Sequence, residues 1–110
     1  MSRSDRVAER IKVEVSEIIR REVDDPRIGF VTITSVKVTP DIKFAKIYIS
    51  VLGTEEEKKE ALEGISSAKN FIKVKLCSKL MLQSMPDIAF EFDASLEKAN
   101  KLWALMQKNK

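Results

Sequence analysis

The apolar pattern between residues 55 and 82 constrains the fold most strongly, because it has the period of a helix but contains one misplaced charge. Its second half keeps the spacing of a buried helical stripe: Ile65, Ile72, Leu76 and Leu80. Lys69 lies four residues after Ile65 and three before Ile72, so a straight helix would direct its ammonium group into this stripe. The segment therefore poses a choice between a break and a lysine that reaches past its neighbours.

A break near Ala68–Lys69–Asn70 resolves the conflict, since two separate helices would each bury their own stripe and turn Lys69 outward. Asparagine is the non-glycine residue that best tolerates the left-handed conformation, so we expect Asn70 to adopt it at the break. The alternative is a continuous helix in which the Lys69 side chain snorkels past its apolar neighbours. We favour the break.

A second amphipathic pattern, over residues 4–23, predicts the first helix of the chain, with Ser4 as its N-cap. Pro26 ends this helix, because a proline moves the preceding residue out of the α region, and Gly29 frees the turn that follows.

Two segments rich in β-branched residues, 30–38 and 42–52, predict an antiparallel hairpin. The apolar phase of the first strand shifts after Ile33, which predicts a bulge near Thr34 and Ser35. Alternate residues of the second strand are expected to face the core: Ala45, Ile47, Ile49 and Val51.

Alternation over residues 88–93 predicts a third strand, and a last helix over about 95–108 begins at Ser95. Its apolar side would consist of Leu96, Ala99, Leu102, Trp103 and Met106. A chain of 110 residues is long enough for one core, so we expect a single domain over residues 1–110. The order α-β-β-α-α-β-α predicts an α+β fold in which helices cover one face of a three-stranded sheet.

The charge of the chain is unevenly distributed, although the net charge is only +3. No acidic residue occurs from Gly64 to Pro86, and this stretch contains Lys69, Lys73, Lys75 and Lys79. Acidic residues gather just before it, which is also the order that the helix dipole favours. A solvated helix face and a surface for an anionic partner both remain open.

Several classes of function find little support in the sequence. The chain has no histidine, and Cys77 lies among apolar residues as the only cysteine, so neither a general base nor a nucleophile is evident. Asp24 and Asp25 are better explained as a turn or as a partner for Arg27 than as a metal site. We expect no enzyme activity, no cofactor, no metal and no membrane span, and a reducing cytoplasm as the compartment.

The pattern of elements and two sequence blocks carry a resemblance to a known family. The blocks are "DDPRIGFVTIT" and "AKIYISVLG", and the similarity continues through "FIKVKL" to "MPDIAFEFDASLEKA". The chain resembles the bacterial ribosome-binding factor A family, whose fold is the type II KH-like domain with an α-β-β-α-α-β order. That family carries Ala-x-Gly at the kink, where this chain has Ala68–Lys69–Asn70. It also carries glycine at Cys77 and a basic residue at Gln83, so this chain lacks part of the usual positive charge.

The resemblance implies a binding protein of the free small (30S) ribosomal subunit and its 16S ribosomal RNA. It also implies a monomer without a small-molecule substrate. This protein would assist late maturation and end processing of the RNA, including during growth in the cold. The alternative from the residues is a protein-interaction module that docks a partner through its last helix, with Trp103 and Met106.

Positive side chains are the expected RNA contacts, because the chain has no GxxG loop with which KH domains clamp single strands. They would contact phosphates of a folded RNA. The primary candidates are Arg3, Arg6, Arg10, Lys69, Asn70, Lys73, Lys75 and Lys79. The secondary candidates are Arg27, Lys37, Lys43 and Lys46, since exposed hairpin faces carry lysine for solubility as well.

Overall fold

Helix α1 spans Arg3–Glu22 in a computed structural model of the chain, which describes residues 2–82 and 84–94. Its N-cap is Ser2 and not Ser4, because the Ser2 hydroxyl accepts a hydrogen bond from the Asp5 N–H and the Asp5 carboxylate accepts one from the Ser2 N–H. This reciprocal pair satisfies two amide groups that the first turn would otherwise leave unpaired. The predicted helix 95–108 lies outside the described residues.

The predicted hairpin is confirmed. Strands β1 (Val31–Val38) and β2 (Phe44–Val51) pair antiparallel, and their register shifts between Ile33 and Ser35, where the sequence predicts a bulge. The residues predicted to face the core on β2 are all buried: Ala45, Ile47, Ile49 and Val51. The phase of the second strand is therefore correct.

Strand β3 (Asp87–Phe92) completes the sheet by pairing parallel with β2, which gives the order β1-β2-β3. Parallel strands cannot be joined by a tight turn, so the chain must cross over between them. Helices α2 (Glu55–Ser67) and α3 (Lys69–Leu80) form this crossover. β1 and β3 are the two edges of the sheet.

The break between α2 and α3 is confirmed, but its predicted geometry is wrong. Ala68 ends α2 and precedes α3 with φ −87° and ψ 3°, while Asn70 lies inside the first turn of α3 without positive φ. The N–H of Ala68 is shared among the carbonyls of Gly64, Ile65 and Ser66, so the chain tightens and changes direction without a left-handed residue. Positive φ occurs instead at Met81, the C-cap of α3.

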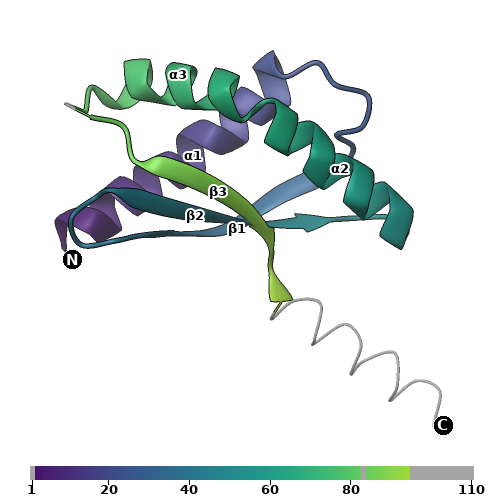
Figure 1. Cartoon of the computed structure of the whole chain (residues 1–110), viewed down its shortest axis with the longest axis horizontal. Coiled ribbons are helices and arrows are strands. Elements are labelled where there is room, and N and C mark those ends of the chain that lie inside the picture. The colour runs from purple at the N-terminus through teal and green to yellow at the C-terminus, as the bar shows by residue number, and fades with distance from the viewer. Residues whose placement is uncertain (1, 83, 95–110) are drawn as a thin grey trace, which may run out of the picture.

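All three helices lie on one face of the sheet, with α1 and α3 side by side (Figure 1). Buried side chains from all three helices and all three strands form one cluster, and its fully buried members include Ile11, Ile18, Ile47, Ile65, Ile72, Leu76 and Ile88. The described part of the fold is thus α-β-β-α-α-β, and the opposite face of the sheet carries no described helix.

Gly64 allows the loop after α1 to approach α2 closely. A Cβ atom at this buried position would lie 3.0 Å from Ile28 Cγ1 and 3.3 Å from Arg27 Cβ. The loop is further fixed by Asp25, whose carboxylate accepts hydrogen bonds from the Arg27 guanidinium at 2.7 Å and from its N–H at 2.9 Å. These bonds hold the pKa of Asp25 below its ordinary value and raise that of Arg27.

Candidate nucleic-acid interface

Two of the lysines of α3 face acidic residues of α1. Lys79 Nζ lies 3.9 Å from Glu14 Oε2, and Lys75 Nζ lies 3.8 Å from Glu22 Oε1. The pairs arise because α1 and α3 run in opposite directions, so Lys79 near the end of α3 lies beside the middle of α1 and Lys75 lies beside its end. Lys75 Nζ also lies 5.6 Å from the ring centroid of Phe71. These long, partly exposed ion pairs reduce the positive potential of the lysines without removing it.

Lys73 is the most firmly held lysine of α3. Its Nζ donates a hydrogen bond of 2.9 Å to Asp87 Oδ1 at the start of β3. This bond lowers the pKa of the Asp87 carboxyl, and the nearby charge of Lys69 contributes in the same direction. Lys73 therefore ties α3 to the edge strand, and a phosphate would have to compete with a carboxylate for it.

The arginines of α1 have a different environment. Arg3, Arg6 and Arg10 line an open groove of about 310 Å³ with the apolar side chains of Val7, Leu80 and Leu82. Arg10 Nη2 donates to the backbone carbonyl of Lys79 at 3.5 Å, where the last turn of α3 leaves carbonyl groups without helical partners. No carboxylate of residues 2–82 or 84–94 forms an ion pair with any of these three arginines.

This arginine groove has the chemistry of a phosphate site. A guanidinium presents a planar set of donors that matches two phosphate oxygens, and it is always charged. Arg3 and Arg10 lie two helical turns apart, so successive guanidinium groups follow one flank of α1. Such a row suits the repeated charges of a nucleic-acid backbone better than a single small anion.

Three arginines near the end of α1 and in the following loop are engaged by carboxylates. Arg20 and Arg21 both bind Glu17, at 2.6 and 2.9 Å, and the Arg20 hydrogen bond lowers the pKa of Glu17. Arg27, a secondary candidate from the sequence, is held by Asp25. Positive charge is thus most available at the beginning of α1.

Lys69 has different surroundings from the other lysines of α3. It lines a hollow of about 760 Å³ together with Lys37 and Lys46, two residues on the face of the sheet away from the helices. Lys43 is exposed near the hairpin turn, and Asn70 is exposed in the first turn of α3. The candidates from the sequence therefore divide between an arginine groove, a set of paired lysines and the outer face of the sheet.

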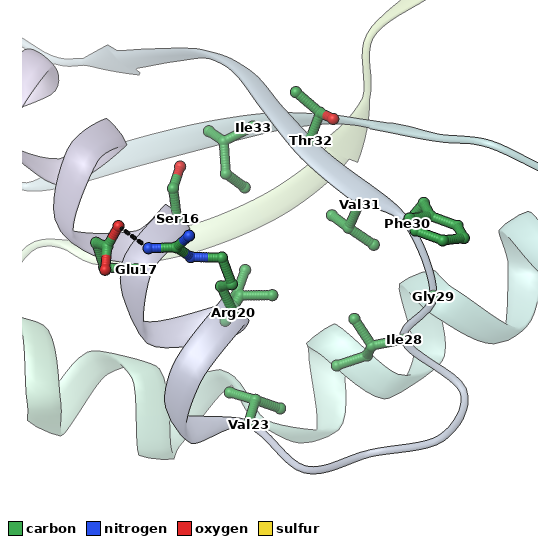
Figure 2. A pocket seen from close by; sticks show the side chains of 11 residues that line it. Ser16, Glu17, Arg20, Val23, Ile28, Gly29, Phe30, Val31, Thr32 and Ile33 are labelled. Atoms are coloured by element: carbon green, nitrogen blue, oxygen red, sulfur yellow. Dashed lines mark hydrogen bonds and ion pairs between the residues drawn. The ribbon is translucent and has the colours of Figure 1, made fainter.

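Another hollow, of about 560 Å³, lies between the second half of α1 and the beginning of β1 (Figure 2). Its lining is largely apolar, with Val23, Ile28 and Val31, and the charges at its side are the mutually paired Glu17 and Arg20. This hollow offers an anion little attraction.

Sequence reasoning missed the apolar floor of the arginine groove and the aromatic residues of the outer face, Phe44 and Tyr48. A signal for the latter exists, since both alternate with the buried residues Ala45 and Ile47. Among the described residues, no group of histidine, cysteine and acidic side chains could hold a metal ion. In the same part of the chain, no helix combines the length and apolarity needed to span a membrane.

Comparisons with known proteins place these features in a family. The family model described as ribosome-binding factor A matches residues 3–106. Ribosome-binding factor A of Staphylococcus carnosus is 45% identical over 105 residues, which cover 96% of this chain and 91% of that protein. A Thermotoga maritima structure, named as a candidate ribosome-binding factor A, is 33% identical with a TM-score of 0.73 and covers 81% of this chain and 85% of its own.

A third similar structure is a homology model of ribosome-binding factor A from Thermus thermophilus, fitted into a cryo-EM map of its complex with the 30S subunit. It is 23% identical to this chain with a TM-score of 0.64, and covers 76% of this chain and 87% of its own. At this identity the likeness concerns the fold.

Proposed function

Because this chain belongs to the ribosome-binding factor A family, we propose that it binds the free small ribosomal subunit through its 16S ribosomal RNA. It assists late maturation and end processing of this RNA, including at low temperature, as a cytoplasmic monomer without catalysis, cofactor or small-molecule substrate. The Thermus relative fitted into a map of a 30S complex supports the small subunit as the partner.

The arginine groove is the observation that carries the RNA part of the proposal. Arg3, Arg6 and Arg10 follow one flank of α1 without acidic partners among the described residues, whereas the lysines at 73, 75 and 79 have them. Contacts from this groove go to phosphates, which position the protein on a folded RNA without reading its sequence. The groove is therefore the primary contact, and the paired lysines of α3 supplement it.

Co-sedimentation tests this proposal directly. The purified chain is mixed in separate samples with isolated small subunits, isolated large subunits and translating ribosomes, and the bound fraction is measured after centrifugation. We expect recovery with small subunits alone. Equal recovery with large subunits, or none with small subunits, would contradict the proposal. A partner held by apolar docking would survive high salt, whereas phosphate contacts weaken steeply.

A further inference from the structure

The outer face of the sheet is an unusual combination of aromatic and basic side chains. Phe44 and Tyr48 alternate along β2 with buried residues, so both rings lie on the face away from the helices. Phe44 is 59% exposed. Ala89 of β3 pairs with Lys46 and leaves space beside them, and all four residues line the same hollow.

The lysines of this face are arranged so that an anion would stabilise them. Lys37 and Lys46 are directly opposite each other in the β1–β2 register, where like charges repel. Lys37 Nζ lies 5.9 Å from the Tyr48 ring centroid, and Lys69 lines the same hollow from the helix side. An anion between Lys37 and Lys46 would relieve their repulsion.

Two acidic residues share this face, and both have partners. Glu91 Oε1 lies 3.7 Å from Lys46 Nζ, and Asp87 is held by Lys73. The first pair is long, and both side chains are about half exposed, so an RNA phosphate can displace the carboxylate at small cost. The net charge of this face remains positive.

We propose that this face binds a short unpaired RNA segment, whose bases stack on Phe44 and Tyr48 while Lys37, Lys46 and Lys69 neutralise its phosphates. The two rings are four residues apart on one strand, about 13 Å, so they serve bases that are not adjacent. Lys46 lies between the rings on the same face and reaches the phosphates that connect those bases. Stacking tolerates any base, so this recognition selects single strands and not a sequence.

This inference rests on the proposed function and deepens it. The arginine groove holds the backbone of folded RNA, and the outer face holds a strand that has not yet paired. An assembly factor with both surfaces would bind a small subunit whose RNA is still partly unfolded and lose one contact when that strand finds its place.

Other exposed aromatic residues provide the control. Phe30 is 80% exposed, but it borders the hollow of Figure 2, where the charges are the paired Glu17 and Arg20. Phe30→Leu and Phe44→Leu therefore remove the same ring from two surfaces, one without and one with unpaired lysines nearby. Phe44→Tyr retains an aromatic face at the proposed site.

The test measures binding of a fluorescently labelled RNA of about eight nucleotides and mixed sequence, and of the same sequence as a duplex. Both RNAs are measured with a variant in which Arg3, Arg6 and Arg10 are replaced by uncharged residues. We expect this variant to bind the single strand more tightly than the duplex. In this background Phe44→Leu should weaken single-strand binding about 5- to 100-fold, while Phe30→Leu and Phe44→Tyr should leave it within about twofold. Thermal unfolding of each variant confirms that it is folded.

Unchanged single-strand affinity in Phe44→Leu, or an equal loss in Phe30→Leu, would overturn the inference. So would a concentration-dependent self-association that Phe44→Leu abolishes while RNA affinity stays the same, since the face would then join two copies. Failure of the proposed function has a different signature: the unmodified chain would not co-sediment with small subunits, whatever the short RNA shows.

Discussion

The first half of α1 and the whole of α3 both carry several positive side chains, but the fold uses them differently. Arg3, Arg6 and Arg10 lie along a groove without acidic partners among the described residues. The lysines at 73, 75 and 79 of α3 face carboxylates at 2.9, 3.8 and 3.9 Å, respectively. The number of charges in a segment therefore does not measure its attraction for a polyanion; the distance to the nearest carboxylate has to be known.

The difference between the two sets is one of degree. Exposed ion pairs contribute about 0.2–1 kcal/mol each, so a phosphate can recruit a lysine at modest cost. Lys75 and Lys79 are both 45% exposed and remain accessible. We therefore expect the lysines of α3 to contribute to RNA binding, but less than the arginine groove.

Loss of the hydrophobic core has the largest expected effect, because the core supports both the arginines of α1 and the lysines of α3. Ile47 is fully buried in the central strand β2. Ile47→Asp would bury an unpaired carboxylate at a cost of several kcal/mol, roughly the whole stability of a small domain. We expect no cooperative thermal transition in Ile47→Asp and an almost unchanged one in Lys43→Ala. A transition at the original temperature in Ile47→Asp would show that the core is assigned incorrectly.

Removal of their acidic partners should make the lysines of α3 as available to RNA as the arginines of α1. In Glu14→Gln with Glu22→Gln, Lys79 and Lys75 lose their nearest carboxylates, so affinity for small-subunit RNA should rise by a few-fold up to about tenfold. Glu56→Gln with Glu60→Gln changes the net charge equally at α2 and serves as the control. Filter binding at fixed salt measures both. An equal gain in the control pair would mean that only net charge matters.

The start of α3 can be tested by substitution at Asn70, which lies in a regular helical turn. Glycine is the poorer helix former and alanine the better one, so Asn70→Gly should cost a few tenths of a kcal/mol and Asn70→Ala should gain a similar amount. Denaturant unfolding of both variants measures the difference. If the two changes in stability had the opposite signs, Asn70 would adopt the left-handed conformation predicted from the sequence. The lysines of α3 would then be oriented differently.

The Lys73–Asp87 contact predicts a small effect of pH. Hydrogen bonding to Lys73 lowers the pKa of Asp87 in the folded state, so the contact stabilises the fold above the ordinary pKa of the carboxyl and is lost as the pH falls through the lowered value. Lys73→Met should therefore raise the pKa of Asp87 toward its ordinary range and remove this part of the acid dependence. An NMR titration of the Asp87 carboxyl measures the shift; an unchanged pKa in Lys73→Met would show that the contact is absent in solution.

Patterns local in sequence predicted most of the described fold. The alternation of Ile47 and Ile49 gave the strand phase, and the shift after Ile33 gave the bulge, because each depends on neighbours within a few residues. Asn70 was misassigned because a tight turn at Ala68 makes the break without positive φ. The signal for the true N-cap was present in the spacing of Ser2 and Asp5.

Features that depend on packing could not be predicted in the same way. The partners of Lys75 and Lys79 follow from the antiparallel placement of α1 against α3, which no local pattern specifies. Gly64 has no distinctive sequence neighbours, and its role becomes visible only when the loop at Ile28 is seen against it. The candidate site was thus identified by residue type, but its division into available and paired charges needed the structure.

The salt dependence of small-subunit binding separates the contribution of the arginine groove from that of the paired lysines. Two variants remove the same number of charges: Arg3→Ala with Arg6→Ala and Arg10→Ala, and Lys73→Ala with Lys75→Ala and Lys79→Ala. We expect the arginine variant to make the slope of log affinity against log salt shallower by about 2 to 3, and the lysine variant by less than about 1. A lysine variant that loses as much slope as the arginine variant, or more, would contradict this expectation.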